Sequence, residues 1–178
     1  MQLKSVGSLI VLLWLGLPSN AIACTCVAGP GEVAWPTLEQ AAAISDVVLI
    51  GRITKQVTLS EPPPYEGQTV AYVEVEVIKG IRGVVSRTNV RVWDGGFGSS
   101  CSVDLRPLRT GVVVAFALER NSGKYREYQE VMKLKIGADD YLLWACGDYK
   151  SHLANEEDVR AVGTRLSEAV RRGRRTRR

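Results

Sequence analysis

Much of the chain alternates apolar and polar residues with the two-residue period of a β-strand. The clearest case is residues 70–77, where alanine and valine alternate with tyrosine and glutamate, so a strand with one buried face is predicted. The near-continuous apolar run at 111–119 predicts a strand that is buried on both faces. Further strands are predicted, from β-branched content or weaker alternation, at residues 47–59, 89–93, 130–137 and 141–146.

Two segments have the period of an α-helix instead. Thr37 follows Pro36 and is expected to cap a short helix over residues 38–44. Near the other end, Asn155 precedes three acidic residues, which favour a helix N-terminus. Apolar residues then recur at helical spacing, at Val159, Val162, Leu166, Ala169 and Val170. We therefore expect one long C-terminal helix within residues 151–170.

These elements together predict an all-β domain with flanking helices. Five or six strands and one long terminal helix fit a small closed or partly closed β-barrel that carries the helix on its surface. Residues 24–150 are long enough to form one such domain with its own core. Strand periodicity alone also fits a β-sandwich.

The first residues have the order of a secretory signal peptide. Lys4 precedes an apolar run at 6–17, polar breakers follow, and Ala21 and Ala23 form a small-x-small cleavage site. The run is too short to span a bilayer as an anchor. We expect residues 1–23 to be removed after Ala23 and the protein to be secreted, either extracellular or periplasmic. The less favoured alternative is a lipoprotein with a lipid on Cys24.

The basic charge of the chain is concentrated at its C-terminus. Without Lys4, the chain has 22 basic and 19 acidic residues, and six of the basic ones are arginines at 171–178. The remainder holds 16 basic against 19 acidic residues, which argues against a nucleic-acid-binding domain. Residues 171–178 are expected to be a solvated, frayed tail. The alternative, functional interpretation of this tail is attraction to an anionic membrane or an acidic glycan surface.

The polar residues do not form an enzyme-like pattern. His152 is the only histidine, so a catalytic or metal site built on several histidines is excluded. The pair Asp139-Asp140 is expected to form a turn, and Trp35, Trp93 and Trp144 are expected to pack in the fold. We therefore expect a protein that is not an enzyme and that has no cofactor or metal of its own.

The four cysteines are expected to form disulfides in an oxidising compartment. Three pairings are possible. A bond between Cys24 and Cys26 would close a very small, strained ring.

The N-terminal part of the chain resembles the N-terminal domain of the tissue inhibitors of metalloproteinases, which are netrin-like modules. In that family the mature chain begins with Cys-x-Cys, often with Thr between and Val after. A short helix and a first strand led by Asp then follow. Here Cys24, Thr25, Cys26 and Val27 match that start, and Asp46 leads the first predicted strand.

Further segments extend the resemblance over most of residues 24–149. The stretch "EVIKGIRG" resembles the turn after the second strand in exported bacterial proteins of this group. The cysteines of "SSC" and "WACGDY", Cys101 and Cys146, fall where the family places its two disulfide partners.

The resemblance implies both a fold and a way of binding. It implies an OB-type barrel with the disulfides Cys24–Cys101 and Cys26–Cys146. It also implies that the free amine and carbonyl oxygen of Cys24 chelate the zinc of a target metalloprotease, which has an open coordination position. Thr25 would enter the protease pocket beside the zinc, and Val27 would pack alongside.

Several positions depart from the family. Ala43 or Ile44 stands where the animal inhibitors have a cysteine of a third disulfide, and Ala28 replaces the usual proline. A helix and an arginine tail replace the second, cysteine-rich domain. Because one fold hosts many functions, the alternative is a structural or adhesion module of the cell envelope without inhibitory activity.

Overall fold

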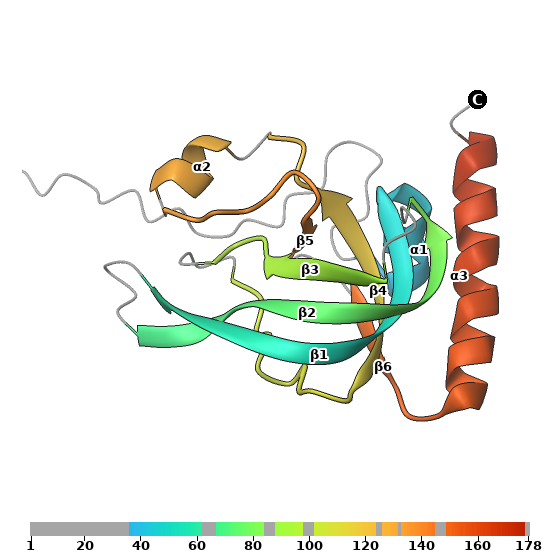
Figure 1. Cartoon of the computed structure of the whole chain (residues 1–178). Helices are drawn as coiled ribbons and strands as arrows, with labels where there is room; N and C mark the ends of the chain where they lie inside the picture. The colour runs from blue at the N-terminus through green and yellow to red at the C-terminus, as the bar shows by residue number, and fades with distance from the viewer. Residues whose placement is uncertain are drawn as a thin grey trace, which may run out of the picture.

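The computed structural model describes residues 36–61, 67–83, 88–97, 102–123, 126–131, 133–144 and 149–176. The elements in these ranges, shown in Figure 1, are α1 (Leu38–Ile44), β1 (Val47–Glu61), β2 (Gly67–Arg82), β3 (Asn89–Asp94), β4 (Val113–Arg120), α2 (Arg126–Val131), β5 (Tyr141–Leu143), β6 (Lys150–Leu153) and α3 (Glu156–Thr176).

The strands form a closed barrel. Hydrogen-bonded neighbours follow the order β1-β2-β3-β5-β4, and β4 pairs again with β1. The pair of β3 and β5 is parallel, whereas the other pairs are antiparallel. The sixth strand, β6, pairs with residues 113–116 of β4. The predicted small OB-type barrel of five to six strands is therefore confirmed, and the sandwich alternative is excluded.

The strand β1 pairs with β2 along one edge and with β4 along the other, and this closes the barrel. Its register with β2 shifts at several points, and such irregularities increase strand twist and bending. Residues 47–52 also pair with β4. Gly51 lies within this doubly paired part, where a Cβ atom would stand 2.2 Å from a Val75 methyl carbon. A larger residue would therefore force β1 and β2 apart.

The barrel strands bury two separate faces. Val47, Leu49 and Ile53 of β1 pack inside the barrel together with Val114 and Phe116 of β4. The alternate residues, Val48 and Ile50 in β1 and Ala115 and Ala117 in β4, pack outside the barrel against α1 and α3. This confirms the prediction of a strand at 111–119 that is buried on both faces.

The two expected helices are present, and each begins where the sequence predicts. The Thr37 hydroxyl accepts a hydrogen bond from the Gln40 N–H at 3.3 Å, and the Gln40 side chain accepts one from the Thr37 N–H at 2.9 Å. Asn155 caps α3, because its side-chain oxygen accepts a hydrogen bond from the Asp158 N–H at 2.9 Å.

The C-terminal helix is longer than predicted. It continues through Arg171–Thr176, which were expected to be a frayed tail. Two physical features explain the difference. Gly173 packs closely against Ala43 of α1, and arginines at a helix C-terminus interact favourably with the helix dipole.

The prediction of a strand at residues 130–137 is wrong. Its first residues belong to α2, and no strand is assigned between residues 133 and 137. The alternation arises because Leu134 and Ile136 pack against the cluster around Trp93 and Phe97. The Ile136 carbonyl is bound by the Asn121 side chain at 3.2 Å instead of a neighbouring strand.

The predicted boundaries of the last strands in the sequence also need correction. Of the strand expected at 141–146, β5 covers Tyr141–Leu143, Trp144 is not in a strand, and Cys146 lies outside the described residues. The strand β6, in which Leu153 is buried, was not predicted from the sequence.

Candidate functional site

The residues of the predicted protease-binding ridge lie outside the described part of the chain. These are Cys24, Thr25, Cys26 and Val27, and the expected disulfide partners Cys101 and Cys146 also lie outside it. The signal peptide and Trp35 fall in the same undescribed N-terminal range. The ridge and both disulfides therefore stay predictions.

Asp94 fixes the backbone on both sides of the undescribed residues 98–101. Its Oδ1 atom accepts hydrogen bonds from the N–H groups of Gly96 and Val103, both at 2.9 Å. The Ser102 hydroxyl donates to its other oxygen. Asp94 is only 1% exposed. A buried carboxylate thus positions the residues that flank Cys101, a role that the sequence analysis did not identify.

Asp140 forms a second buried network. Its Oδ2 atom accepts hydrogen bonds from the Trp93 indole at 2.9 Å and from the Gly137 N–H at 2.8 Å. Its Oδ1 atom accepts one from the Arg91 Nε at 2.9 Å. The predicted turn at Asp139-Asp140 is confirmed by the hydrogen bond from the Asp140 N–H to the Gly137 carbonyl. All of these contacts stabilise the fold, so we assign Asp140 a structural role.

The other predicted packing residues also have partners within the fold. Trp93 is buried in the cluster with Phe97, and its ring centroid lies 4.4 Å from that of Tyr72. Trp144 packs against the same cluster and donates a hydrogen bond to Glu119 at 3.1 Å. His152 is an exposed residue of β6. These observations confirm the predicted packing of Trp93 and Trp144.

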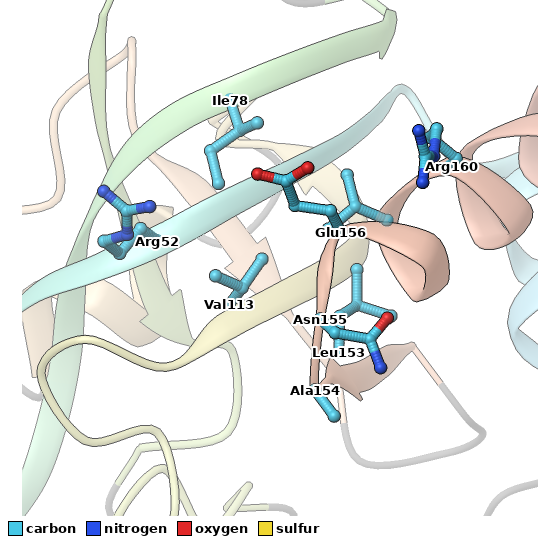
Figure 2. Close-up of a pocket in the computed structure, with 9 residues that line it drawn as sticks. Arg52, Ile78, Val113, Leu153, Ala154, Asn155, Glu156 and Arg160 are labelled. Carbon is cyan, nitrogen blue, oxygen red and sulfur yellow. The ribbon is translucent and has the colours of Figure 1, made fainter.

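An apolar groove lies between the barrel and the first turn of α3. Its volume is about 440 Å³, and its lining residues are Arg52, Ile78, Val113, Leu153, Ala154, Asn155, Glu156, Val159 and Arg160. Binding pockets for small molecules usually measure about 300–1,000 Å³ and combine an apolar lining with a few polar groups. The groove has this character (Figure 2).

Ile78 is the unusual residue of the groove. It is a large apolar side chain that is 43% exposed, on β2. In Figure 2 the Glu156 side chain extends from the start of α3 toward Ile78 and Arg52. Ile78 has the same parity along the strand as Glu74 and Glu76. An apolar residue on a polar strand face is a sequence feature that could have indicated an exposed apolar site here, but no groove was predicted from it.

The charged groups around the groove are arranged by the capping of α3. The Ala154 N–H donates to the Asp158 carboxylate at 2.9 Å, which complements the bond from the Asp158 N–H to Asn155. This cap fixes the first turn of α3, on which Glu156 and Arg160 lie. On the opposite wall, Arg52 forms an exposed ion pair with Glu76 at 3.5 Å.

The pKa of Asp104, a residue outside this groove, is shifted by a neighbouring arginine. Arg106 donates a side-chain hydrogen bond to Asp104 and thereby lowers the pKa of that carboxyl below its ordinary value. The pair is exposed and does not line the groove.

Neither a metal cluster nor a membrane span is found among the described residues. No three side chains of His, Cys, Asp or Glu come together there as possible metal ligands. Within the same ranges, no helix is long and apolar enough to cross a bilayer.

The described residues form a barrel with an apolar groove at its surface. No protein-family model matches the chain, and no curated protein matches it. What is established is an OB-type barrel with a helix-flanked apolar groove, and the kinship to the metalloproteinase inhibitors remains a prediction from the sequence.

Proposed function

We propose that this chain is an exported, disulfide-stapled binding protein and a candidate inhibitor of zinc metalloendopeptidases. The observation that carries the proposal is the arrangement of the first elements. The short helix α1 is followed at once by Asp46 and β1, and β1 is a strand of a closed OB-type barrel. This is the order that the resemblance predicts after a Cys-x-Cys start.

The proposed mechanism depends on the amine and carbonyl oxygen of Cys24. After cleavage behind Ala23, these two atoms would chelate the zinc of the target protease at its open position. An unperturbed α-amine has a pKa of about 7.7–8.0, so its deprotonation near neutral pH costs little free energy. The disulfides from Cys24 and Cys26 would hold the chelating atoms in place and reduce the entropy lost on binding.

The inhibition assay needs a chain with Cys24 as its first residue. We expect that mature chain to inhibit at least one member of a panel of zinc endopeptidases at micromolar concentration or below. Thr25→Gly should alter the relative inhibition of different proteases, because it removes a pocket contact and keeps the chelating atoms. If the native mature chain inhibits no protease of the panel at micromolar concentration, the inhibitor proposal is wrong.

A second candidate function is a binding or adhesion module of the cell envelope without inhibitory activity. The groove favours this alternative, because it leaves Ile78 exposed between strands and helix. In that case Cys24 and Cys26 would serve only to attach the N-terminus to the barrel, and the groove or the arginine-rich end of α3 would bind the partner. An intact disulfide framework without inhibition would support this second function.

A further inference from the structure

Four exposed arginines form the last turns of α3. Arg171, Arg172, Arg174 and Arg175 all belong to the helix and are exposed. Within the described ranges, none of these four side chains forms an ion pair. Their charges are therefore available to an external anion, and the helix fixes their positions on the surface.

An exposed isoleucine lies at the same end of the molecule. Ile44 is the last residue of α1 and is 56% exposed. Its neighbour Ala43 contacts α3, since a Cβ atom on Gly173 would stand 2.5 Å from the Ala43 carbonyl oxygen. That carbonyl also accepts a hydrogen bond from Arg82 at the end of β2, at 3.1 Å. Figure 1 shows the ends of β2 and α3 close to α1 at this end.

We infer that this basic end, made of Ile44, Arg171, Arg172, Arg174 and Arg175, docks on an anionic lipid membrane. The arginines match the negative surface potential of anionic lipids. Ile44 supplies what charge alone does not, because an apolar side chain gains free energy by entering the boundary between headgroups and acyl chains. A soluble acidic polysaccharide would use the arginines and would have no use for the isoleucine.

Docking by the basic end would orient the rest of the protein. The groove lies at the start of α3, where it is lined by Asn155, Glu156, Val159 and Arg160. The 21 residues of α3 separate the two ends. At about 1.5 Å per residue, the helix spans roughly 30 Å. The groove would then face away from the lipid surface and stay accessible. This inference deepens the proposed binding function and does not depend on protease inhibition.

The test is co-sedimentation of the mature chain with two kinds of vesicles. One kind contains phosphatidylcholine alone, and the other contains phosphatidylcholine with phosphatidylglycerol. We expect salt-sensitive binding to the anionic vesicles only. Each arginine near an anionic surface adds about fivefold to partitioning, so replacing Arg171, Arg172, Arg174 and Arg175 by glutamine should reduce binding by roughly a hundredfold or more. Ile44→Ser should reduce binding about fivefold through lost apolar burial.

Matched controls separate this surface from general charge and hydrophobicity. A variant with Arg109, Arg126, Lys133 and Lys135 replaced by glutamine loses the same four charges elsewhere and should keep its binding. Ile78→Ser removes the exposed isoleucine of the groove and should also bind as the native chain does. Circular dichroism spectra and melting temperatures identify any variant that has lost its fold.

Three results would overturn the inference. The first is absence of binding to anionic vesicles at low salt. The second is an equal loss of binding in the control variant with four charges removed. The third is that Ile44→Ser weakens neither the binding to anionic vesicles nor the binding to heparin, which would indicate an acidic polysaccharide as the partner. A native chain that binds anionic vesicles without inhibiting any protease would support this inference and contradict the inhibitor proposal.

Discussion

The carboxylate of Asp140 accepts a hydrogen bond from the indole N–H of Trp93 at 2.9 Å, across 47 positions of sequence. The two residues lie on segments that meet where β3 pairs in parallel with β5. Asp140 is buried, and its second oxygen binds Arg91 at 2.9 Å. This contact joins the third strand of the barrel to the turn in front of its fifth.

Replacing Asp140 should therefore weaken the closure of the barrel. Asp140→Asn keeps the side-chain size but removes the negative charge that faces Arg91. Hydrogen bonds to charged groups contribute about 1.5–3 kcal/mol, so we expect the free energy of unfolding to fall by about that amount. Urea unfolding measures the change. Glu168→Gln, which removes an exposed carboxylate charge on α3, is the control and should have almost no effect. Equal stability of both variants would show that the buried network contributes nothing.

The contact between Gly173 and Ala43 should tolerate no side chain. A Cβ atom on Gly173 would stand 2.5 Å from a backbone oxygen, so Gly173→Ala must displace α3 from α1. We expect the free energy of unfolding of this variant to fall by about 1–3 kcal/mol, as it does when other well-packed contacts are overfilled.

Gly163→Ala is the matched control in the same helix. Its nearest neighbour would be the flexible end of Lys79 at 3.0 Å, which can move away. Alanine is favoured over glycine inside a helix by up to about 1 kcal/mol, so this variant should be neutral or slightly more stable. Urea midpoints that rank Gly173→Ala above Gly163→Ala would contradict the packing of α3 against α1.

Local physical rules predicted much of this fold. Thr37 and Asn155 could be predicted as helix starts because each cap is a local contact, in which the side chain accepts a hydrogen bond from an N–H three positions later. Residues 70–77 were predicted as a strand from their two-residue period, and residues 111–119 were predicted as one from a near-continuous apolar run. The burial of β2 and β4 agrees with both predictions.

The remaining features depend on contacts that are distant in the sequence. The alternation at 130–137 looks like that of a strand, but Leu134 and Ile136 are apolar because they cover Trp93 and Phe97. The four-residue strand β6 is too short for a period to be recognised. The groove was not predicted either, because it forms only when the start of α3 is placed beside Ile78.

The disulfide pairing that the family resemblance implies leads to a prediction for the mature protein. We expect the secreted chain to start at Cys24, to carry no free thiol, and to contain the bonds Cys24–Cys101 and Cys26–Cys146. Each bond closes a long loop, for which chain-entropy estimates give about 4–5 kcal/mol, so reduction should lower the melting temperature markedly. Intact-mass analysis and non-reducing peptide mapping check this. A lipid on Cys24, or a thiol that can be alkylated in the native protein, would contradict it.

The most direct test of the proposed function is a comparison of two N-termini in the same inhibition assay. One protein begins at Cys24, and the other carries a single additional alanine before Cys24. The addition keeps the disulfides and the barrel but moves the amine away and fills the space of the zinc. We predict that the first protein inhibits a zinc endopeptidase and that the extended protein loses this inhibition. Equal inhibition by both proteins would show that the Cys24 amine does not chelate zinc, and absence of inhibition by both would leave the two cysteines as a structural clamp.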